Sequence, residues 1–585
     1  PVSVNGQTST MIFQEKIVKE FLESQYRREG PLLEGDERFL WDKNYGDFFS
    51  KENISLSKQL NAEWSNLGSN PLYISIDAIS RLQNVYMGYS NQFPLKKLTL
   101  ELYKLANNSE HLLELWKEFE ILMTIMNASH GLRPHNRKFY WNPFYQGFEP
   151  VYYDGSFSIN NFKISKDLQP LDLIWYQANL SDSNFEGVIE KLKSINIDSF
   201  EKDLQLARVG ATSIKPRQII STIINNVESF RKMLKEKRNI AVKNNLDTNS
   251  RDTRNNYYER LSRAENDFYY VETALDSSEN EVSLSHRICS EITCKAFQFS
   301  QNEMETLLEG KYIYRGRPVI YLGLTNTLEK KSFKTFIDEL DLNIIHSEDM
   351  KISYEKNSRK ITFTQENDED WALISNHNLK EVKIEFVGVK KVKSLEFETQ
   401  RINDFGLTGC ITFYSIEFYK TSIKSEKGGC EDSINIINSF GTLDSLEVTE
   451  AYADSIDIDF SVLEIDNIFV QKAGNDCLDF SSGKYNLGEV QVEFCTDKAI
   501  SIGERSFFNG TVILISNSNI GISSKDSSIA KIREINAENV DICLEAYNKK
   551  QEFNGSYLSV KNLNCEGLMH RKDDYSQVII NSRIF

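Results

Sequence analysis

His130, Asn136 and Asp154 are the residues of this chain whose types and spacing point most directly to chemistry. They lie in HGLRPHNRKFYWNPFYQGFEPVYYDG, residues 130–155, where two strand-like segments flank the turn NPFYQG. A hairpin of this kind returns Asn136 and Asp154 to the same end. Phosphoryl transfer needs Mg²⁺ ligands, a positioned acceptor and neutralised charge more than it needs covalent partners. We therefore expect Asn136 and Asp154 to bind Mg²⁺ together.

Other polar residues of the same stretch can complete such a site. His135 can serve as the base, because an imidazole titrates near the working pH. Arg133, Arg137 and Lys138 can neutralise phosphate charge. Two further interpretations stay open. One is a buried polar hairpin without chemistry, in which a His–Asn pair satisfies backbone groups. The other is a basic and aromatic binding loop over residues 135–141.

The segment 130–155 resembles the catalytic loop and metal-binding Asp of the protein-kinase-like fold, in the version found in spore-coat-protein-H (CotH) kinases. It is also similar to the HGD…N…D layout of aminoglycoside and choline kinases. MIFQEKIVKEFLES (11–24) resembles the strand and hinge between the two lobes, and YRREGPLLEGDERFLWD (26–42) resembles the segment that follows. The resemblance covers residues 5–240 and implies a C-terminal kinase lobe that takes Mg²⁺ and ATP.

Carried over residue by residue, the resemblance implies that Asn136 and Asp154 hold Mg²⁺ and that His130 anchors the loop backbone. Glu15 would lie near the nucleotide. The catalytic Asp of the family would fall at positions 131–132, which are Gly and Leu here. The resemblance therefore implies either an active phosphotransferase or a pseudokinase. The glycine-rich loop and phosphate-binding Lys are expected upstream of residue 1, in a longer protein.

The second half of the chain contains a repeat. Apolar residues recur at intervals of 22 residues in strings such as DSINI, DSIDI, DCLDF and KAISI. The series comprises Ile434, Ile456, Leu478, Ile500 and Ile522, with Ile411 before it and Ile542 after it. Short strands at this period predict a right-handed parallel β-helix, whose stacked coils share one core. A leucine-rich repeat has a similar period, but its signature is absent.

The alternation of apolar and polar residues also predicts columns of polar side chains on one outer face. The first column comprises Thr412, Asn435, Asp457, Asp479, Ser501 and Ser523, and the second comprises Asp432, Asp454 and Asp476, continued loosely by Asp497. Stacked carboxylates repel unless they are solvated, hydrogen-bonded or bridged by a cation. Either these residues cap turns, or they line a saccharide-binding or Ca²⁺-assisted groove, with Lys498 and Arg505 as partners of an acidic sugar.

These patterns predict a multidomain α+β chain. We expect a mainly helical kinase-like partial domain over 1–245 with a hairpin at 137–154, a helical linker region over 246–310, mixed strands over 311–380 and the β-helix over 381–585. No apolar run is long enough to span a membrane. The eight cysteines show neither a CxxC pair nor zinc spacing. This favours buried, reduced cysteines over zinc ligands or disulfides.

Composition excludes some partners. The net charge of −17 argues against nucleic acid and against an anionic membrane surface. GNDCLDFSSG and DKAISIGE resemble segments of bacterial proteins associated with surface polysaccharide or the envelope. Two functions follow. One is a kinase-like phosphotransferase or pseudokinase whose β-helix binds a glycan or an envelope protein. The other is a carbohydrate-binding or carbohydrate-active β-helix, of the lyase or epimerase kind, with a helical accessory domain. The sequence leaves the compartment (cytoplasm or envelope) and the oligomeric state open.

Overall fold

The structure is a computed structural model. It describes residues 2–4, 7–9, 17–38, 56–90, 92, 96, 98–159, 162–206, 215–241, 254, 258, 268–278, 281–290, 293–326, 332–390 and 401–585. Glu15 lies outside these described residues. Among the described helices, none combines the length and the apolar character that a membrane crossing needs.

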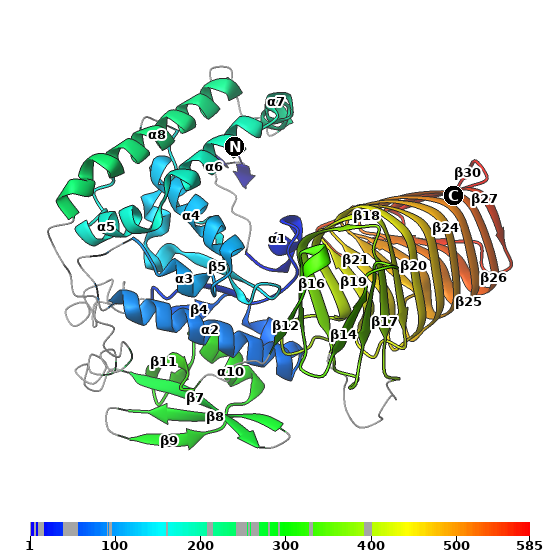
Figure 1. The fold of residues 1–585 in the computed structure, drawn as a ribbon, viewed down its shortest axis with the longest axis horizontal. Coiled ribbons are helices and arrows are strands. Elements are labelled where there is room, and N and C mark those ends of the chain that lie inside the picture. Colours follow the sequence, from blue (N-terminus) through cyan, green and yellow to red (C-terminus); the bar gives the residue numbers. More distant parts are fainter. Residues whose placement is uncertain are drawn as a thin grey trace. The chain divides into compact units, whose positions relative to one another are not determined.

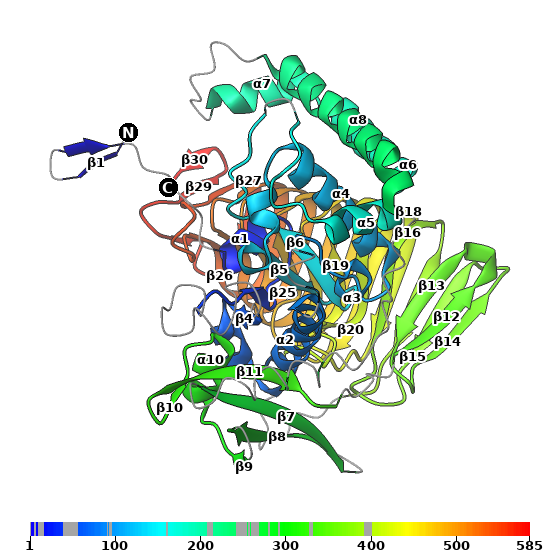
Figure 2. The same cartoon turned by 90° about the vertical axis from the view of Figure 1, so that its left-hand side faces the viewer.

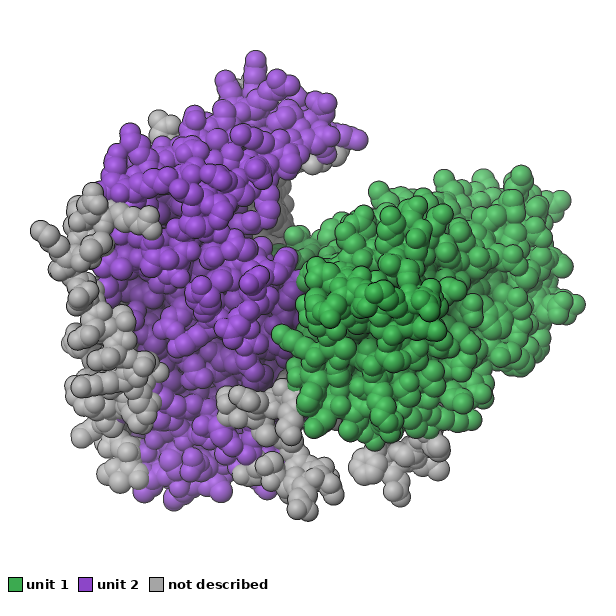
Figure 3. Space-filling model, viewed as in Figure 1, with its two compact units in different colours: residues 1–29, 329–585 green, residues 30–328 purple. Residues whose placement is uncertain are grey.

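The chain forms two compact units, which are coloured separately in Figure 3. Unit 1 comprises residues 1–29 and 329–585, and unit 2 comprises residues 30–328. Unit 1 begins with the short strands β1 (Val2–Val4) and β2 (Gln7–Ser9) and the helix α1 (Lys19–Ser24).

Most of unit 1 is a parallel β-helix of about ten turns. Its strands stack side by side, from green through yellow to red in Figure 1. They are β16 (Ala372–Lys380), β17 (Lys383–Val387), β18 (Gly409–Glu426), β19 (Asp432–Ile437), β20 (Phe440–Ala451), β21 (Asp454–Asp459), β22 (Val462–Ala473), β23 (Leu478–Ser481), β24 (Lys484–Gly503), β25 (Phe507–Lys525), β26 (Ile529–Tyr547), β27 (Tyr557–Cys565), β28 (Arg571–Lys572) and β29 (Gln577–Ile580).

The predicted apolar ladder forms the centre of this β-helix. Ile411 pairs in register with Ile434, and the ladder continues through Ile456, Leu478 and Ile500 to Ile522. All of these side chains are fully buried in one continuous core. The last predicted member was wrong, because Ile522 pairs with Leu544 and Ile542 pairs with Ile520. The final interval is therefore 22 residues as well, and Ile542 belongs to a neighbouring position of the coil.

Both ends of the β-helix carry antiparallel strands. At the N-terminal end, β12 (Phe333–Ile337) pairs with β13 (Leu342–His346), and β14 (Lys351–Glu355) pairs with β15 (Lys360–Thr364), with the 3₁₀ turn η4 (Asp338–Leu340) between β12 and β13. These strands are visible beside β16 and β18 in Figure 2. At the C-terminal end, β30 (Arg583–Ile584) folds back antiparallel onto β29. Such ends shield the edges of the ladder from further pairing.

Unit 2 has a four-stranded antiparallel sheet in the order β4 (Ser57–Gln59), β3 (Leu32–Gly35), β5 (Lys138–Asn142) and β6 (Gly147–Val151). Its helices are α2 (Ser69–Ser90), α3 (Leu102–Leu105), α4 (Glu110–Ile125), α5 (Pro170–Asn179), α6 (Asp182–Ser194), α7 (Ile197–Leu206) and α8 (Pro216–Ala241), with 3₁₀ turns η1 (Ala62–Leu67), η2 (Ser129–Leu132) and η3 (Pro134–Asn136). Helices α4, α5, α6 and α8 bury their apolar faces against one another.

The expected helical linker over 246–310 is largely a sheet where the structure describes it. Strands β7 (Tyr269–Ser278), β8 (Glu281–Cys289), β9 (Cys294–Phe297), β10 (Ile313–Tyr314) and β11 (Arg317–Leu324) form a five-stranded sheet, with helix α10 (Gln301–Leu308) after β9. The N-terminal part of the chain is 26% helical. The prediction of a mainly helical N-terminal part is therefore not confirmed.

The expectation of reduced cysteines was wrong. The eight cysteines form four disulfides: Cys289–Cys294, Cys410–Cys430, Cys477–Cys495 and Cys543–Cys565. The last three join residues separated by 20, 18 and 22 positions, which is close to one coil. A coil-length separation places two cysteines on adjacent turns, so the β-helix itself brings them together. A search for CxxC and zinc spacings misses this geometry.

Replacing Cys477 and Cys495 by Ser is expected to destabilise the β-helix by about 3 kcal/mol, because the bond closes a loop of nearly one coil. Hydrogen exchange of β-helix peptides under increasing urea measures this change. The control is the Cys289→Ser/Cys294→Ser variant, whose disulfide lies in unit 2 and which should leave β-helix protection unchanged. Equal protection in both variants contradicts a stabilising role for Cys477–Cys495.

Candidate metal–nucleotide site and acidic face

The hairpin of unit 2 has the predicted form. β5 pairs antiparallel with β6 from Lys138↔Val151 to Asn142↔Gly147. Asn142 closes the turn, because its Oδ1 accepts hydrogen bonds from the backbone N–H groups of Phe144 and Tyr145. Asn136 precedes the first strand and Asp154 follows the second. The hairpin therefore brings both residues to the same end of the sheet, where we define the hairpin site as His130, His135, Asn136 and Asp154.

His130 is the point at which these side chains meet. Its Nδ1 lies 3.1 Å from Asn136 Nδ2, 3.0 Å from the Asp154 carbonyl oxygen and 3.3 Å from Asp154 Oδ2. Asn136 also donates to the His130 carbonyl oxygen at 3.0 Å. Asp154 adopts a left-handed backbone with φ of 42°, which Asp tolerates better than most residues. The side chains of His130 and Asp154 are about half exposed, whereas Asn136 is buried.

His135 is held neutral in this site. Burial, together with the charges of Arg133 and His130, lowers its pKa to about 4. Its Nδ1 is buried and has no hydrogen-bond partner. A neutral imidazole can accept a proton, but one with so low a pKa is a weak base at pH 7.

All three predicted phosphate-binding cations already have carboxylate partners, and two of them are buried. Arg137 is buried, and its Nη2 lies 2.6 Å from Glu120 Oε1. Lys138 forms an ion pair with Glu34, and its Nζ lies 3.9 Å from the centre of the Tyr153 ring. Arg133 is more exposed and pairs with Asp167 at 2.9 Å. These contacts make Arg137 and Lys138 structural supports of the hairpin rather than ready ligands for phosphate.

A buried polar group behind the site was missed by sequence reasoning. Glu120 of α4 is fully buried and accepts from Arg137 and, at 3.0 Å, from the Tyr176 hydroxyl. Arg137 Nε in turn donates to the Leu132 carbonyl oxygen at 2.8 Å and so fixes the loop before the hairpin. The signal was available, because Glu120 follows Leu112 and Trp116 on the apolar stripe of its helix. A charge at such a position indicates a buried partner.

The predicted columns of the β-helix are confirmed by its register. The first column runs in unbroken register through Thr412, Asn435, Asp457, Asp479, Ser501 and Ser523. In the second column, Asp432 pairs with Asp454, and Asp454 Oδ1 accepts from the Asp476 backbone N–H at 2.8 Å. We call these residues, together with Asp459 of the same strand, the acidic face.

The next position of the second column is Lys498, not Asp497. The Lys498 backbone N–H donates to Asp476 Oδ1 at 3.0 Å, one coil further on. Its ammonium pairs with Asp497 and lies 3.4 Å from Asp476 Oδ1. Lys498 thus neutralises carboxylates of its own chain. These ion pairs explain how the carboxylates of the second column can stack at Lys498. No bound sugar is needed to explain the position of this lysine.

The acidic face is more buried than an outer stripe predicts. Thr412, Asp432, Asn435, Asp454, Asp476, Ser501 and Ser523 are all buried. Arg28, from the segment that follows α1, accounts for part of this cover. Its Nη2 pairs with Asp457, and it reaches Asp459 Oδ2 through Nε at 2.9 Å and Nη2 at 2.8 Å. Its Nη1 donates to Thr408 Oγ1 at 2.7 Å.

A second ionic contact joins the N-terminal segment to the β-helix. Lys550 lies 3.0 Å from Glu23 of α1 and 3.0 Å from Glu504 of the coil. Tyr26 makes an edge contact with Phe460, with ring centres 5.9 Å apart. Residues 17–29 are therefore a docked part of unit 1.

Burial raises the pKa values of several aspartates of the acidic face. Burial and neighbouring carboxylates raise the pKa of Asp454 to about 7 and that of Asp476 to about 6, with Lys498 opposing the rise for Asp476. Burial also raises the pKa of Asp432 to about 7, although Arg28 opposes this. The pKa of Asp457 is raised by burial and by Asp459 and Asp432.

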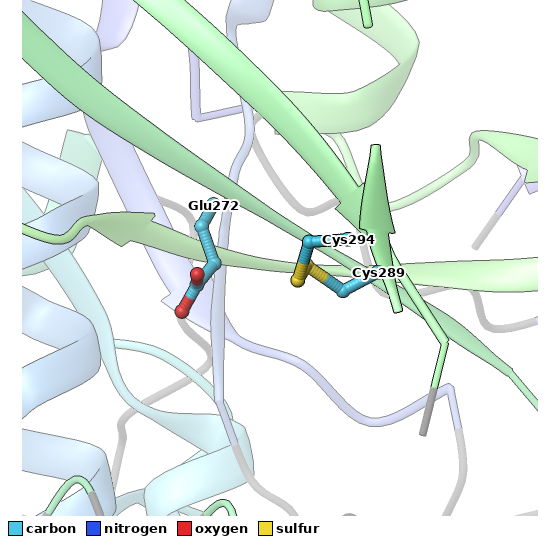
Figure 4. A group of neighbouring side chains, drawn as sticks. All are labelled: Glu272, Cys289 and Cys294. Carbon is cyan, nitrogen blue, oxygen red and sulfur yellow. A yellow bond between two sulfur atoms is a disulfide. The ribbon is translucent and has the colours of Figure 1, made fainter. Parts of the chain in front are cut away.

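Among the described residues, one group of three side chains of metal-ligand type comes close enough to share an ion: Glu272, Cys289 and Cys294, shown in Figure 4. The two sulfur atoms are bonded to each other, so neither is a thiolate. Glu272 accepts from Tyr258 and lies 3.4 Å from Arg287 Nη2. This group is therefore a disulfide beside a paired carboxylate.

No family model, curated protein or solved structure matches this chain. The resemblance to CotH-type kinases therefore stays a prediction from the quoted motifs.

The Asp454→Asn variant is expected to change the pH dependence of β-helix stability. A folded-state pKa above the unfolded value of 3.8 means that the native state binds more protons than the unfolded state up to about pH 7. The contribution of Asp454 to stability is thus full below pH 4 and is lost as the pH rises to 7. Asn removes this titration, so the variant should gain on the order of 2 kcal/mol over wild type between pH 5 and pH 8.

Urea unfolding at pH 5, 6.5 and 8, followed by hydrogen exchange of β-helix peptides, measures this gain. The matched control is Asp466→Asn, an exposed Asp of the same β-helix. A variant that becomes less stable than wild type as the pH rises shows that Asp454 is ionised and stabilising.

Proposed function

We propose that unit 2 carries a kinase-like Mg²⁺–nucleotide site, either an active phosphotransferase or a pseudokinase. The observation that supports this most is the convergence of Asn136 and Asp154 on one nitrogen of His130, at the open end of the hairpin. An amide oxygen and a carboxylate are ligands that suit Mg²⁺, which binds proteins through few groups and completes its shell with phosphate and water.

The residues of the chain take distinct roles in this proposal. Asn136 and Asp154 hold Mg²⁺, which neutralises phosphate charge when bound. His130 fixes the relative positions of both ligands through its ring and its carbonyl oxygen. Glu120 and Arg137 hold the preceding loop from behind. Arg133 pairs with Asp167 but is more exposed than Arg137 and Lys138, so we assign it the contact with phosphate.

The weakness of the available base favours nucleotide binding over phosphoryl transfer. No carboxylate stands between His130 and Asn136, and His135 is a weak base because of its lowered pKa. Phosphoryl transfer through a loose transition state depends only weakly on a strong base, so the proposal includes both binding and transfer. We propose nucleotide binding as the primary property of the site.

The four disulfides support a compartment outside the reducing cytoplasm, because such bonds persist in oxidising environments. Among the two locations that the sequence leaves open, this favours the cell envelope. An envelope protein or a polysaccharide then becomes the proposed partner of the β-helix.

A second candidate function is saccharide binding by the acidic face. Asp479 favours it, because its Oδ1 is buried and accepts no hydrogen bond from any residue in the described part of the chain. A sugar hydroxyl can supply the missing donor. Glycan-array binding that Asp479→Asn abolishes and Asp154→Ala preserves is the expected outcome. Binding that survives Asp479→Asn contradicts this candidate.

Mg²⁺-ATP is expected to stabilise the protein, and the Asp154→Ala variant should lose this effect. At a ligand concentration of 100 times Kd, the gain amounts to about 2.7 kcal/mol. Thermal-shift titration of the full-length gene product with Mg²⁺-ATP measures this stabilisation. The control is Asp198→Ala, because Asp198 is an exposed Asp of unit 2 outside the hairpin.

Absence of a shift in wild type, together with failure of Mg²⁺-ATP to displace a fluorescent nucleotide, rejects the site. If binding is present, radiolabelled ATP and the bacterial envelope fraction then separate transfer from binding alone.

A further inference from the structure

Three buried oxygen atoms of the acidic face accept no hydrogen bond from the residues that the structure describes. They are Thr412 Oγ1, Asp432 Oδ2 and Asn435 Oδ1. Their residues are only 0%, 3% and 1% exposed. Buried polar atoms in native proteins nearly always have a partner, so each such atom calls for an explanation. Three in one place indicate a ligand that is shared between them.

The three residues lie close to Gly409. Two adjacent coils pair Gly409 with Asp432 and, three residues further along the strands, Thr412 with Asn435. Gly409 itself carries no side chain. A Cβ at Gly409 would lie 2.7 Å from Thr412 Oγ1 and 2.8 Å from Asn435 Cβ. The threonine hydroxyl and the asparagine side chain therefore both crowd this position, which only a residue without a Cβ can occupy.

The orientation of Asn435 follows from its other contacts. Its Nδ2 donates to Asp457 Oδ2 at 3.0 Å and to the Asp457 carbonyl oxygen at 3.3 Å, toward the following coil. The amide oxygen of Asn435 therefore points toward the preceding coil, which contains Thr412. Asp432 is held in place from the same side, because its backbone N–H donates to the Thr408 carbonyl oxygen at 3.1 Å.

A carboxylate, an amide oxygen and a hydroxyl are hard oxygen ligands. We propose that Thr412, Asp432 and Asn435 form a binding site for a divalent cation of the Ca²⁺ type in the β-helix, independent of the proposed nucleotide site. Ca²⁺ takes six to eight oxygen ligands in flexible geometry and accepts water or backbone carbonyls for the rest. Mg²⁺ suits this site less, because it demands regular octahedral geometry.

The charges around the site support a cation over a water molecule. Asp432, Asp454, Asp457 and Asp459 lie on two adjacent coils. Among the residues that the structure describes, Arg28 is the cation that contacts this group directly, through Asp457 and Asp459. Four carboxylates therefore face one guanidinium. A divalent ion supplies the missing positive charge, whereas water supplies hydrogen bonds alone.

Arg28 and the ion then act on the same carboxylates. Replacing Arg28 by Gln removes one positive charge from the face and keeps a polar side chain of similar length. The remaining carboxylates should attract Ca²⁺ more strongly, so the affinity for Ca²⁺ is expected to rise about tenfold. This dependence on a residue that is not a ligand distinguishes the proposed site from any other Ca²⁺ site in the protein.

The experiment uses the full chain, freed of metal with EDTA and titrated with Ca²⁺ by calorimetry and thermal shift. Wild type is expected to show a saturable rise in melting temperature. Asp432→Asn should abolish it, and Thr412→Val should weaken binding at least tenfold. The matched control Asp466→Asn and the hairpin variant Asp154→Ala should bind Ca²⁺ as wild type does. Retained binding in Asp154→Ala with lost Mg²⁺-ATP binding separates the two sites.

Far-UV circular dichroism establishes that each variant is folded before titration. If Asp432→Asn does not fold, the comparison of wild type with Thr412→Val and Arg28→Gln decides the question. The proposal is overturned if wild type shows no Ca²⁺ effect, if Asp432→Asn or Thr412→Val binds as wild type does, or if Arg28→Gln leaves the affinity unchanged. The first of these outcomes assigns the three oxygens to buried water.

Discussion

The parallel register of the β-helix is the constraint on which the rest of unit 1 depends. Residues one coil apart lie about 4.8 Å from each other, because parallel strands stack at that spacing. On the inner face this stacks Ile on Ile and builds a continuous core. On the outer face the same rule stacks Asp457 on Asp479. The repeat that supplies the core therefore also creates a column of like charges, which the protein must compensate.

The compensation comes from three places. Arg28 enters from the N-terminal segment, Lys498 takes a place in the second column, and Lys525 donates to Ser501 Oγ at 2.9 Å. Each is a partly or fully buried cation beside carboxylates. Removing one partner of such a pair generally costs about 3–5 kcal/mol, since an uncompensated charge stays behind. Docking of residues 17–29 on the β-helix is thus part of the electrostatic balance of the acidic face.

The sequence predicted features that repeat or alternate. The Ile411 to Ile522 ladder, the first polar column and the 137–154 hairpin follow from local periodicity, so they could be read without knowing the fold. The partner of Ile522 was misplaced because Ile542 lies two residues before the true partner, Leu544, and pairs with Ile520 instead. The strands between 268 and 297 were missed because their polar residues mask the alternation of a two-sided sheet.

The tertiary partners could not be predicted in the same way. Arg28 lies more than 400 positions before Asp457 along the chain, and no local pattern indicates that pairing. The disulfides depend on coil geometry, which becomes a guide only once the β-helix is recognised. In unit 2, Arg137 and Lys138 have the composition of phosphate ligands, yet Glu120 and Glu34 neutralise them. Residue type gives the chemistry that a side chain can perform, and its buried neighbours decide whether it is free to perform it.

Buried neighbours also bear on why the β-helix keeps aspartates in its acidic face. Replacing a buried ionic cluster by apolar residues of similar volume is often neutral or stabilising, so stability alone does not account for four aspartates on two adjacent coils. A repeat protein can place Ser or Thr at these positions, as it does at Ser501 and Ser523 two and three coils further on. The first column returns to a carboxylate at Glu545, which pairs in register with Ser523 and forms an ion pair with Arg571. Arg28 beside Asp457, Lys498 beside Asp476 and Arg571 beside Glu545 show that the chain places a cation next to the stacked carboxylates, and this pairing lets the β-helix keep them.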